Sequence, residues 1–216
     1  MSYIYKTGRI ELYEQIKRQA HFVKGKVLDI GAGSFSRYQN LFCYDEYIKI
    51  DVVPGRNVDV VGKIEKIPFT DETFDSIVCT QVLGDVYNLH EAFDEMYRVL
   101  KPNGIILLTE SLFDPLHDEP HDFFRFTKHS LKRLAEDAGF KVKILEQRGG
   151  YWSIMAQFKA RYWIERLHAN NKWFVRIFSF GLKLLGSWAI FLDSRDGSRA
   201  NKMFTHGYIL IAQKHA

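Results

Sequence analysis

Two glycines and a distant aspartate have the residue types and the spacing of a nucleoside-binding loop. Gly31 and Gly33 follow the apolar run 26–30, where glycine lets the backbone turn tightly and lets a ligand come close. Asp51 lies twenty residues after Gly31, at the end of the next apolar run. A carboxylate there can accept hydrogen bonds from both hydroxyls of a ribose. A ribose-containing ligand is therefore expected, and a glycine turn without a ligand is the alternative.

The residues around these glycines favour a nucleoside that carries an amino acid over a phosphate-rich cofactor. A dinucleotide site needs a third glycine at position 36, where this chain has Ser36. Asp29, directly before the loop, would repel a phosphate but could face an amino group. A nucleotide-dependent oxidoreductase is therefore disfavoured. The loop is also expected to open a helix.

A second group of polar residues lies in segment 116–127, which reads Leu-His-Asp-Glu-Pro-His-Asp-Phe-Phe-Arg-Phe-Thr. His117 and His121 are candidates for a general base, because histidine titrates near neutral pH. Asp85, which follows another predicted strand, is a further candidate catalytic residue. A metal ion bound by His117, His121 and Asp118 is the less favoured interpretation, so no metal site is predicted.

The same segment also has a purely structural interpretation. Asp122 would cap a turn, and Arg125 would pair with a buried carboxylate such as Glu110. The sequence leaves the structural and the catalytic interpretation open.

Alternating strands and helices must position these residues. Strands are expected at residues 26–30, 47–50, 58–61, 75–79, 105–109, 141–146 and 206–212, and helices at residues 9–23, 92–100 and 130–138. Residues 101–104 are expected to form a turn between a helix and a strand. The alternation predicts an α/β fold in which helices cover both faces of a mostly parallel sheet. Ligands of such sheets bind beyond the carboxyl ends of the strands.

The composition is that of one globular domain. The chain has 216 residues, of which 46% are hydrophobic and 26% charged, and residues 1–216 are expected to form a single domain. The two cysteines exclude a disulfide framework, and the charged first twenty residues argue against a signal peptide, so a cytoplasmic protein is expected. Residues 151–216 carry a net charge of +7 and the rest of the chain −3, which predicts different surroundings for the two parts.

The run Val27-Leu-Asp-Ile-Gly-Ala-Gly33 resembles the first motif of class I S-adenosylmethionine-dependent methyltransferases, in particular the type-11 subgroup. The resemblance continues through residues 67–78, Val82-Leu83 and residues 95–104, and it covers roughly residues 25–147. It implies a Rossmann-like, seven-stranded sheet whose last strand is antiparallel. It also implies an enzyme of this class, with S-adenosylmethionine as its cofactor.

Position by position, the resemblance implies which residues contact the cofactor. The cofactor-binding residues would be Asp29, Gly31, Ala32, Gly33, Asp51, Val52, Ile64, Thr80 and Gln81. The first loop and residues 80–81 would surround the methionine part. Asp51 would hold the ribose, while Val52 and Ile64 would lie against the adenine. Lys63 departs from the subgroup, which usually has an acidic residue there to accept from the adenine amino group.

Residues 151–192 interrupt the alternation and are expected to form two helices inserted before the last strand. Within them, residues 173–192 carry only the charges of Arg176 and Lys183, seven residues apart on one helical face. This spacing argues against a spanning helix and favours a helix in a membrane interface, or a lid over an apolar acceptor. A helix buried against the sheet or against a second subunit is the alternative.

These observations together predict a methyltransferase that O-methylates a sugar, a lipid-linked glycan or another small apolar-tailed acceptor. Segment 116–127 resembles one in family members from bacterial surface-polysaccharide gene clusters, which implies polysaccharide biosynthesis. An RNA ribose methyltransferase and a non-catalytic cofactor-binding partner protein are the alternatives. Nucleic acid is otherwise not expected, because Cys79-Thr-Gln-Val-Leu lacks the Asn/Asp-Pro-Pro-aromatic signature of base methyltransferases. Peripheral contact with the inner face of the membrane through residues 173–192 is expected.

Overall fold

Two compact units make up the computed structural model, which describes residues 7–166 and 172–215, with the side chains of residues 7 and 172–180 outside that description. The sheet unit consists of Gln15–Gln147 and Gly207–Ala216, and the helical unit of Met1–Glu14 and Arg148–His206. The expectation that the whole chain forms one domain with an inserted helical pair stays a prediction.

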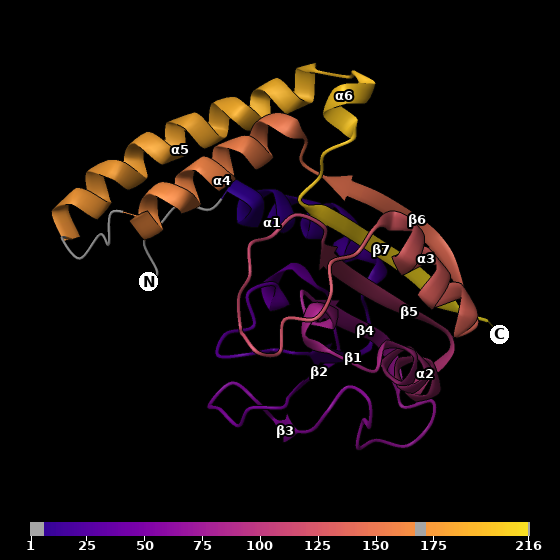
Figure 1. Ribbon diagram of the computed structural model, residues 1–216. Coiled ribbons are helices and arrows are strands. Elements are labelled where there is room, and N and C mark those ends of the chain that lie inside the picture. The colour runs from indigo at the N-terminus through magenta and orange to yellow at the C-terminus, as the bar shows by residue number, and fades with distance from the viewer. Residues whose placement is uncertain (1–6, 167–171, 216) are drawn as a thin grey trace. The chain divides into compact units, whose positions relative to one another are not determined.

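The sheet unit contains a seven-stranded sheet in the order β3-β2-β1-β4-β5-β7-β6. The strands are β1 (Lys26–Ile30), β2 (Glu46–Asp51), β3 (Val60–Val61), β4 (Phe74–Thr80), β5 (Leu100–Ser111), β6 (Phe140–Arg148) and β7 (Gly207–Lys214). The pairs from β3 to β5 are parallel, whereas β7 runs antiparallel to β5. This arrangement confirms the predicted Rossmann-like, mostly parallel fold with an antiparallel last strand (Figure 1).

Most of the helices lie where the sequence predicts them, but the short helix at Arg199–Lys202 was not expected. They are α1 (Thr7–Gln19), α2 (Leu89–Val99), α3 (Lys128–Asp137), α4 (Tyr151–Arg166), α5 (Lys172–Arg195) and α6 (Arg199–Lys202), with short 3₁₀ turns at Ala20–Phe22, Gln39–Leu41 and Leu83–Asp85. Helices α2 and α3 lie side by side on the sheet, α2 against β5 and α3 against β7 (Figure 1). A capping box between Thr127 and Ser130 begins α3 and explains its sharp start.

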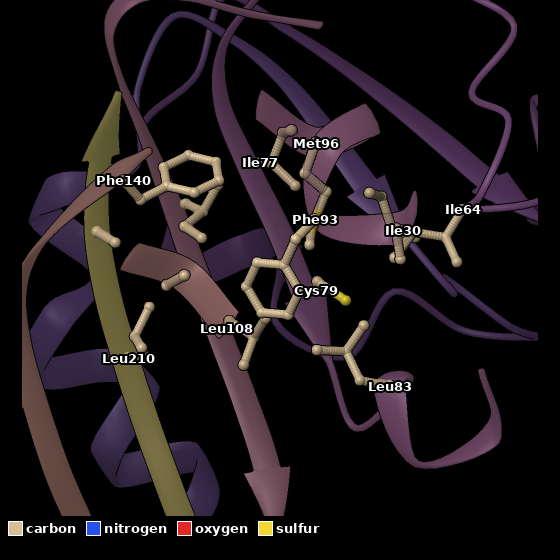
Figure 2. Close-up of a cluster of buried hydrophobic side chains, with 14 of the residues drawn as sticks. Ile30, Ile64, Ile77, Cys79, Leu83, Phe93, Met96, Leu108, Phe140 and Leu210 are labelled. Carbon is tan, nitrogen blue, oxygen red and sulfur yellow. The ribbon is translucent and has the colours of Figure 1, made fainter. Parts of the chain in front are cut away.

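A hydrophobic core fills the space between α2 and the sheet (Figure 2). Every second residue of the central strands points into this core. Cys79 of β4 pairs with Leu108 of β5, and Leu108 pairs with Leu210 of β7, so the three side chains lie on the same face of the sheet. Phe93 and Met96 of α2 are fully buried against this layer. The intervening residues of the central strands are buried on the opposite face, which is why these strands are almost continuously apolar in sequence.

The strand order brings the carboxyl ends of three strands together. Ile30, the last residue of β1, pairs with Ile50 of β2 on one side and with Cys79 of β4 on the other. The segments that follow these strands therefore meet at one edge of the sheet. Ligands of parallel α/β sheets bind at this edge.

The segment after β1 differs from the expected element. The prediction that the glycine loop opens a helix is wrong, because residues 31–45 contain only turns and the 3₁₀ turn Gln39–Leu41. Side chains satisfy the loop backbone in place of a helix. Asp51 accepts a hydrogen bond from the Gly33 amide, and Asn57 donates one to the Gly33 carbonyl.

The predicted turn at residues 101–104 is also wrong. These residues belong to β5, which pairs with β4 at Leu100 and again from Ile105 onwards. Asn103 has a φ of +64° within this irregular stretch. The turn-forming residues therefore make a bulge inside one strand instead of a break between two elements.

In the helical unit, α5 supplies the cap of α4. Oδ2 of Asp193 accepts hydrogen bonds from the Gly150 and Ser153 amides, and Oδ1 accepts one from the Trp152 amide, each at 3.0 Å. A helix N-terminus has unpaired amides and a positive dipole end, so a carboxylate stabilises it. Helices α4 and α5 confirm the expected helical pair. Of the helices in the described ranges, none is long and apolar enough to cross a membrane.

A buried ionisable pair lies in the same unit. Oε2 of Glu11 lies 3.3 Å from Nε2 of His206, and their side chains are 12% and 2% exposed. Burial raises the pKa of Glu11 to about 7; the charge of Asp193 reinforces the rise and that of Arg148 opposes it. Burial also lowers the pKa of His206 to about 3, and Arg148 contributes to this shift. The folded protein therefore disfavours the charged form of both groups.

Candidate active site

Gly31 and Gly33 both have left-handed backbone angles, with φ of +70° and +59°. The Gly31 amide donates to the Ile50 carbonyl at 2.9 Å, and a Cβ on Gly31 would lie only 2.3 Å from Cγ2 of Val82. A Cβ on Gly33 would have a single neighbour within 4 Å, at 4.0 Å. Gly31 is thus required for close packing, whereas Gly33 leaves its backbone open to a ligand.

Asp51 ends β2 and links it to the glycine loop. Its Oδ2 accepts a hydrogen bond from the Gly33 amide at 2.8 Å, and its Oδ1 accepts one from the Val53 amide at 2.9 Å. A carboxylate oxygen can accept a second hydrogen bond, so Asp51 keeps acceptor capacity for two hydroxyls. Val52, beside it, is 59% exposed. Asp51 therefore both fixes the loop and remains able to bind a ligand.

Asp29, which precedes the glycine loop in the sequence, is nearly fully buried. Its carboxylate accepts a hydrogen bond from the Tyr47 hydroxyl at 2.9 Å and another from Ser36. Burial raises the pKa of Asp29 to about 6, and these two hydrogen bonds oppose the rise. Sequence reasoning missed two contacts of this site: the Tyr47 hydroxyl donates to Asp29, and the Asn57 side chain donates to the Gly33 carbonyl. The only indication of these contacts in the sequence was a polar side chain beside a short strand.

The loop after β4 begins in an unusual conformation. Thr80 ends the strand, and Gln81 follows it with a φ of +58°. The Gln81 amide donates to the Thr109 carbonyl at 2.8 Å, and Oε1 of Gln81 accepts a hydrogen bond from the Ser111 hydroxyl at 2.6 Å. A left-handed backbone costs a non-glycine residue on the order of 1–3 kcal/mol, so β5 must stabilise this bend.

A buried carboxylate shapes the rest of that loop. Glu110 is 2% exposed, and its Oε1 accepts hydrogen bonds from the amides of Val82 at 3.0 Å and Leu83 at 2.8 Å. Arg125 pairs with a buried carboxylate, as the structural interpretation of the sequence predicts, but this carboxylate is Asp122, whose side chain is 2% exposed, in place of the suggested Glu110. Asp122 and Arg125 lie three residues apart on the same turn.

Ile64 lies in the hydrophobic core, where Figure 2 shows it beside Ile30 at the end of β1. The residue is 5% exposed. Lys63, before it, is exposed and accepts a backbone hydrogen bond from Lys66 at 3.1 Å. The contact of Ile64 with an adenine stays a prediction.

Asp85, His117 and Asp122 come together from two separate loops. One ligand-type atom from each lies within 4.8 Å of the others. Arg125 binds both oxygens of Asp122 and thereby holds the pKa of this carboxyl far below its usual range. The backbone amide of His117 also donates to Asp122, at 3.0 Å. Asp122 thus holds the turn in place, as its sequence position predicts. Both carboxylate oxygens of Asp122 already accept hydrogen bonds from Arg125.

The ring of His117 is oriented for proton uptake. Its Nδ1 lies 2.9 Å from the Pro115 carbonyl oxygen, 3.4 Å from Nη2 of Arg125 and 3.6 Å from Oδ2 of Asp122. The guanidinium only donates, but the shorter contact, to a carbonyl that only accepts, favours the neutral ring with its proton on Nδ1 and its lone pair on Nε2. The side chain is 34% exposed, which lets a ligand reach it. His117 therefore has the arrangement of a general base.

Asp85 faces His117, whereas His121 does not join this group. Burial raises the pKa of Asp85; His117 opposes the rise and Asp118 reinforces it. Among the residues that the structure describes, Oδ1 of Asp85 is buried without a hydrogen-bond partner. His121 is exposed and contacts Phe123, with ring centroids 6.1 Å apart.

Residues 28–108 match the model of a family described as a methyltransferase domain. This part of the chain is similar to class I methyltransferase domains. The match agrees with the resemblance seen in the sequence. A ubiquinone/menaquinone biosynthesis C-methyltransferase of Cronobacter sakazakii is 35% identical to this chain over 109 residues, which are 44% of this chain and 42% of that protein. The chain thus spans less than half the length of this curated relative.

Solved structures share the fold of this chain. A putative methyltransferase of Bacillus halodurans has a TM-score of 0.60 at 18% identity, over 94% of this chain and 99% of that chain. A phosphoethanolamine N-methyltransferase of Haemonchus contortus, solved in complex with S-adenosyl-L-methionine, has a TM-score of 0.56 at 16% identity, over 96% of this chain and 52% of that chain. The methyltransferase domain implies S-adenosylmethionine as cofactor.

The residues at the edge of the sheet fit this cofactor. The open backbone at Gly33 would take the methionine part together with the loop at Gln81. The remaining acceptor capacity of Asp51 suits the ribose, and the exposed Val52 next to it suits the adenine. The Asp29 carboxylate already accepts hydrogen bonds from Tyr47 and Ser36. It would therefore support the glycine loop, and it would interact with an amino group of the cofactor less than its sequence position suggests.

Replacing Asp51 by alanine is expected to weaken the binding of S-adenosylhomocysteine by roughly 1.5–3 kcal/mol, because charge-assisted hydrogen bonds to the ribose and to the loop are lost. Asp51→Asn, which keeps an acceptor oxygen for the Gly33 amide, is expected to lose less. Titration calorimetry on both variants measures the effect. An unchanged dissociation constant for Asp51→Ala would reject the ribose role.

Proposed function

We propose that the protein is an S-adenosylmethionine-dependent methyltransferase that methylates a hydroxyl oxygen of a small acceptor bound beside His117. The orientation of the His117 ring carries this proposal, since the short contact with the Pro115 carbonyl favours the proton on Nδ1 and leaves Nε2 as a base. When bound, the cofactor supplies a methyl group on a positively charged sulfur. The protein must therefore align the acceptor, exclude water and remove the hydroxyl proton.

The residues around His117 have separate tasks in this proposal. Nε2 of His117 takes the proton of the acceptor hydroxyl. Asp122, held by Arg125, keeps the turn that carries His117 in place through the His117 amide. Asp85 offers its unbonded Oδ1 to a second polar group of the acceptor, which would satisfy a buried oxygen. Asp85 and Asp122 therefore position the reacting groups, and His117 moves the proton.

Exposed aromatic rings next to Asp85 support an acceptor with a ring. Tyr87 is 70% exposed and Phe123 is 41% exposed, and their rings meet edge to face with centroids 5.4 Å apart. An aromatic surface beside carboxylates suits a ring that has an apolar face and polar edges, as a sugar has. We therefore include a sugar or a lipid-linked glycan, and with it polysaccharide biosynthesis, in the proposal.

Carbon methylation of an aromatic ring is the second candidate. The curated relative is named a C-methyltransferase of ubiquinone and menaquinone biosynthesis, and the Tyr87–Phe123 surface also suits a flat aromatic acceptor. A hydroxyl on such a ring would again give its proton to His117, and the neighbouring ring carbon that takes the methyl group would lose its hydrogen as a proton that restores the hydroxyl. The ¹³C shift of a methyl group transferred from labelled cofactor distinguishes a product with a C–O bond from one with a C–C bond.

The protein is expected to bind S-adenosylhomocysteine with a dissociation constant in the low micromolar range or below, about −8 kcal/mol, and not to bind NAD. The reason is the open Gly33 backbone combined with Asp51, and the absence of a helix N-terminus after the loop that would face a pyrophosphate. Calorimetry with both ligands measures this difference. Tight NAD binding without a response to S-adenosylhomocysteine would remove the basis of the proposed function.

A further inference from the structure

The second half of α5 exposes its large apolar side chains and buries its small ones. Leu184, Leu185, Trp188 and Phe191 are 58%, 64%, 64% and 51% exposed. On the same helix Gly186 and Ala189 are buried. A helix of a globular protein normally shows the opposite pattern, with its large apolar residues in the core. This part of α5 is therefore built to contact something outside its own unit.

The exposed apolar residues share one face of the helix. Leu184, Trp188 and Phe191 follow one another at spacings of four and three residues, and Leu185 widens the face. The exposed polar residues Ser187 and Ser194 lie to one side of it. We call the four apolar residues the α5 face. An exposed apolar stripe of this kind marks a contact with a partner or a lipid.

The net charge of the helical unit, together with Arg195 at the end of the α5 face, favours one kind of surface as its partner. Residues 148–206, which form most of the helical unit, contain ten lysines and arginines against three acidic residues. Arg195, one turn beyond Phe191, lies over the Phe191 ring with its guanidinium carbon 5.2 Å from the centroid. An anionic surface would therefore meet apolar and cationic groups together. A second copy would instead bring the same excess of positive charge against itself.

The exposed aromatic residues of the helical unit also favour a lipid surface as the partner. Tryptophan and tyrosine are favoured at the boundary between lipid headgroups and acyl chains, where one part of the ring is apolar and the other bonds to water. Besides Trp188 on α5, the packed helix α4 exposes Tyr162 by 61% and Trp163 by 50%. A lipid interface satisfies these rings and the basic residues at once.

From these observations we propose that the helical unit docks on an anionic lipid bilayer, with the α5 face inserted among the headgroups and the axis of α5 lying along the membrane surface. The basic residues of the unit bind the anionic headgroups. This inference does not depend on the proposed methyl transfer. It also gives a direct role to α5, a helix of 24 residues.

Co-sedimentation of the full chain with vesicles tests the proposal. The protein is expected to pellet with phosphatidylglycerol vesicles, to pellet much less with phosphatidylcholine vesicles, and to be released as salt rises. Leu184→Glu with Leu185→Glu is expected to lower the bound fraction roughly tenfold or more, because both changes remove apolar insertion. Ser187→Glu with Ser194→Glu adds the same charge beside the face and is expected to keep most of the binding.

Several outcomes would overturn the proposal. Wild-type protein that ignores both kinds of vesicle excludes a lipid partner. A dimer in sedimentation velocity that the Leu184→Glu, Leu185→Glu variant converts to monomer assigns the α5 face to a second copy. An equal loss of vesicle binding in the two glutamate double variants would show that charge alone, without apolar insertion, holds the protein on the vesicles. If the leucine variant loses its folded circular dichroism spectrum, Leu184→Ser with Leu185→Ser replaces it, and affinity for S-adenosylhomocysteine serves as the control for an intact sheet unit.

Discussion

Replacement of His117 by alanine is expected to lower the turnover number by roughly 10²–10⁴, the usual contribution of a general base, while the affinity for S-adenosylhomocysteine stays unchanged. The substitution removes the only imidazole of the Asp85–His117–Asp122 group, together with the Nε2 that is proposed to take the proton. The backbone amide of His117 remains bonded to Asp122, so the turn is expected to persist. Initial rates with labelled cofactor, after an acceptor screen over hydroxylated saccharides and quinols, measure the effect.

Two further histidine variants make this result specific. His129→Ala changes an exposed histidine on α3 and serves as the matched control. His121→Ala tests the other base suggested by the sequence, which lies against Phe123 and outside the group. Full activity of His117→Ala together with an inactive His121→Ala would move the base to His121. Full activity of both variants would leave segment 116–127 with a structural role only.

Replacement of Glu11 by glutamine is expected to remove a pH-dependent loss of stability of roughly 3 kcal/mol. Burial raises the pKa of Glu11 from 4.5 to about 7, so between these values the folded state holds a proton that the unfolded state releases. Its stabilising contribution is complete below pH 4.5 and is lost as the pH rises through about 7. The free energy of unfolding of wild type should therefore fall relative to Glu11→Gln across this window.

The difference in the free energy of unfolding between wild type and Glu11→Gln separates the titration of Glu11 from that of the neighbouring His206. His206 has a depressed pKa of about 3, so its contribution is present above pH 6.5 and is lost as the pH falls through about 3 in both proteins. Glu14→Gln, an exposed change on the same helix, provides the matched control. Denaturant titrations at several pH values measure all three proteins. Parallel curves for wild type and Glu11→Gln would contradict the prediction.

Sequence pattern was sufficient for the elements of the sheet unit. Apolar runs such as 26–30 and 75–79 are strands because their residues are buried on both faces, and this pattern depends little on distant contacts. The glycine loop and the strand end at Asp51 were predictable for a related reason. A left-handed backbone at Gly31 and a carboxylate at a strand end follow from local residue types.

The contacts that shape the candidate site were not predictable in the same way. Glu110 binds amides that lie 28 and 27 residues earlier in the chain, so only the pairing of β4 with β5 brings them together. The missing helix after Gly33 has a similar cause, because Asp51 and Asn57 take backbone groups that a helix would use. Both depend on tertiary contacts that a local pattern does not contain.

The position of β7 has a consequence for how the chain folds. In the sheet, β7 lies between β5 and β6, although 58 residues of the helical unit separate the end of β6 at Arg148 from the start of β7 at Gly207. During synthesis the edge of β5 therefore stays open until the whole helical unit has been made, and β6 has no partner strand in the meantime. An open edge of apolar residues is a site for aggregation and for chaperone binding. The length of the inserted helices thus sets the time for which the nascent protein needs protection.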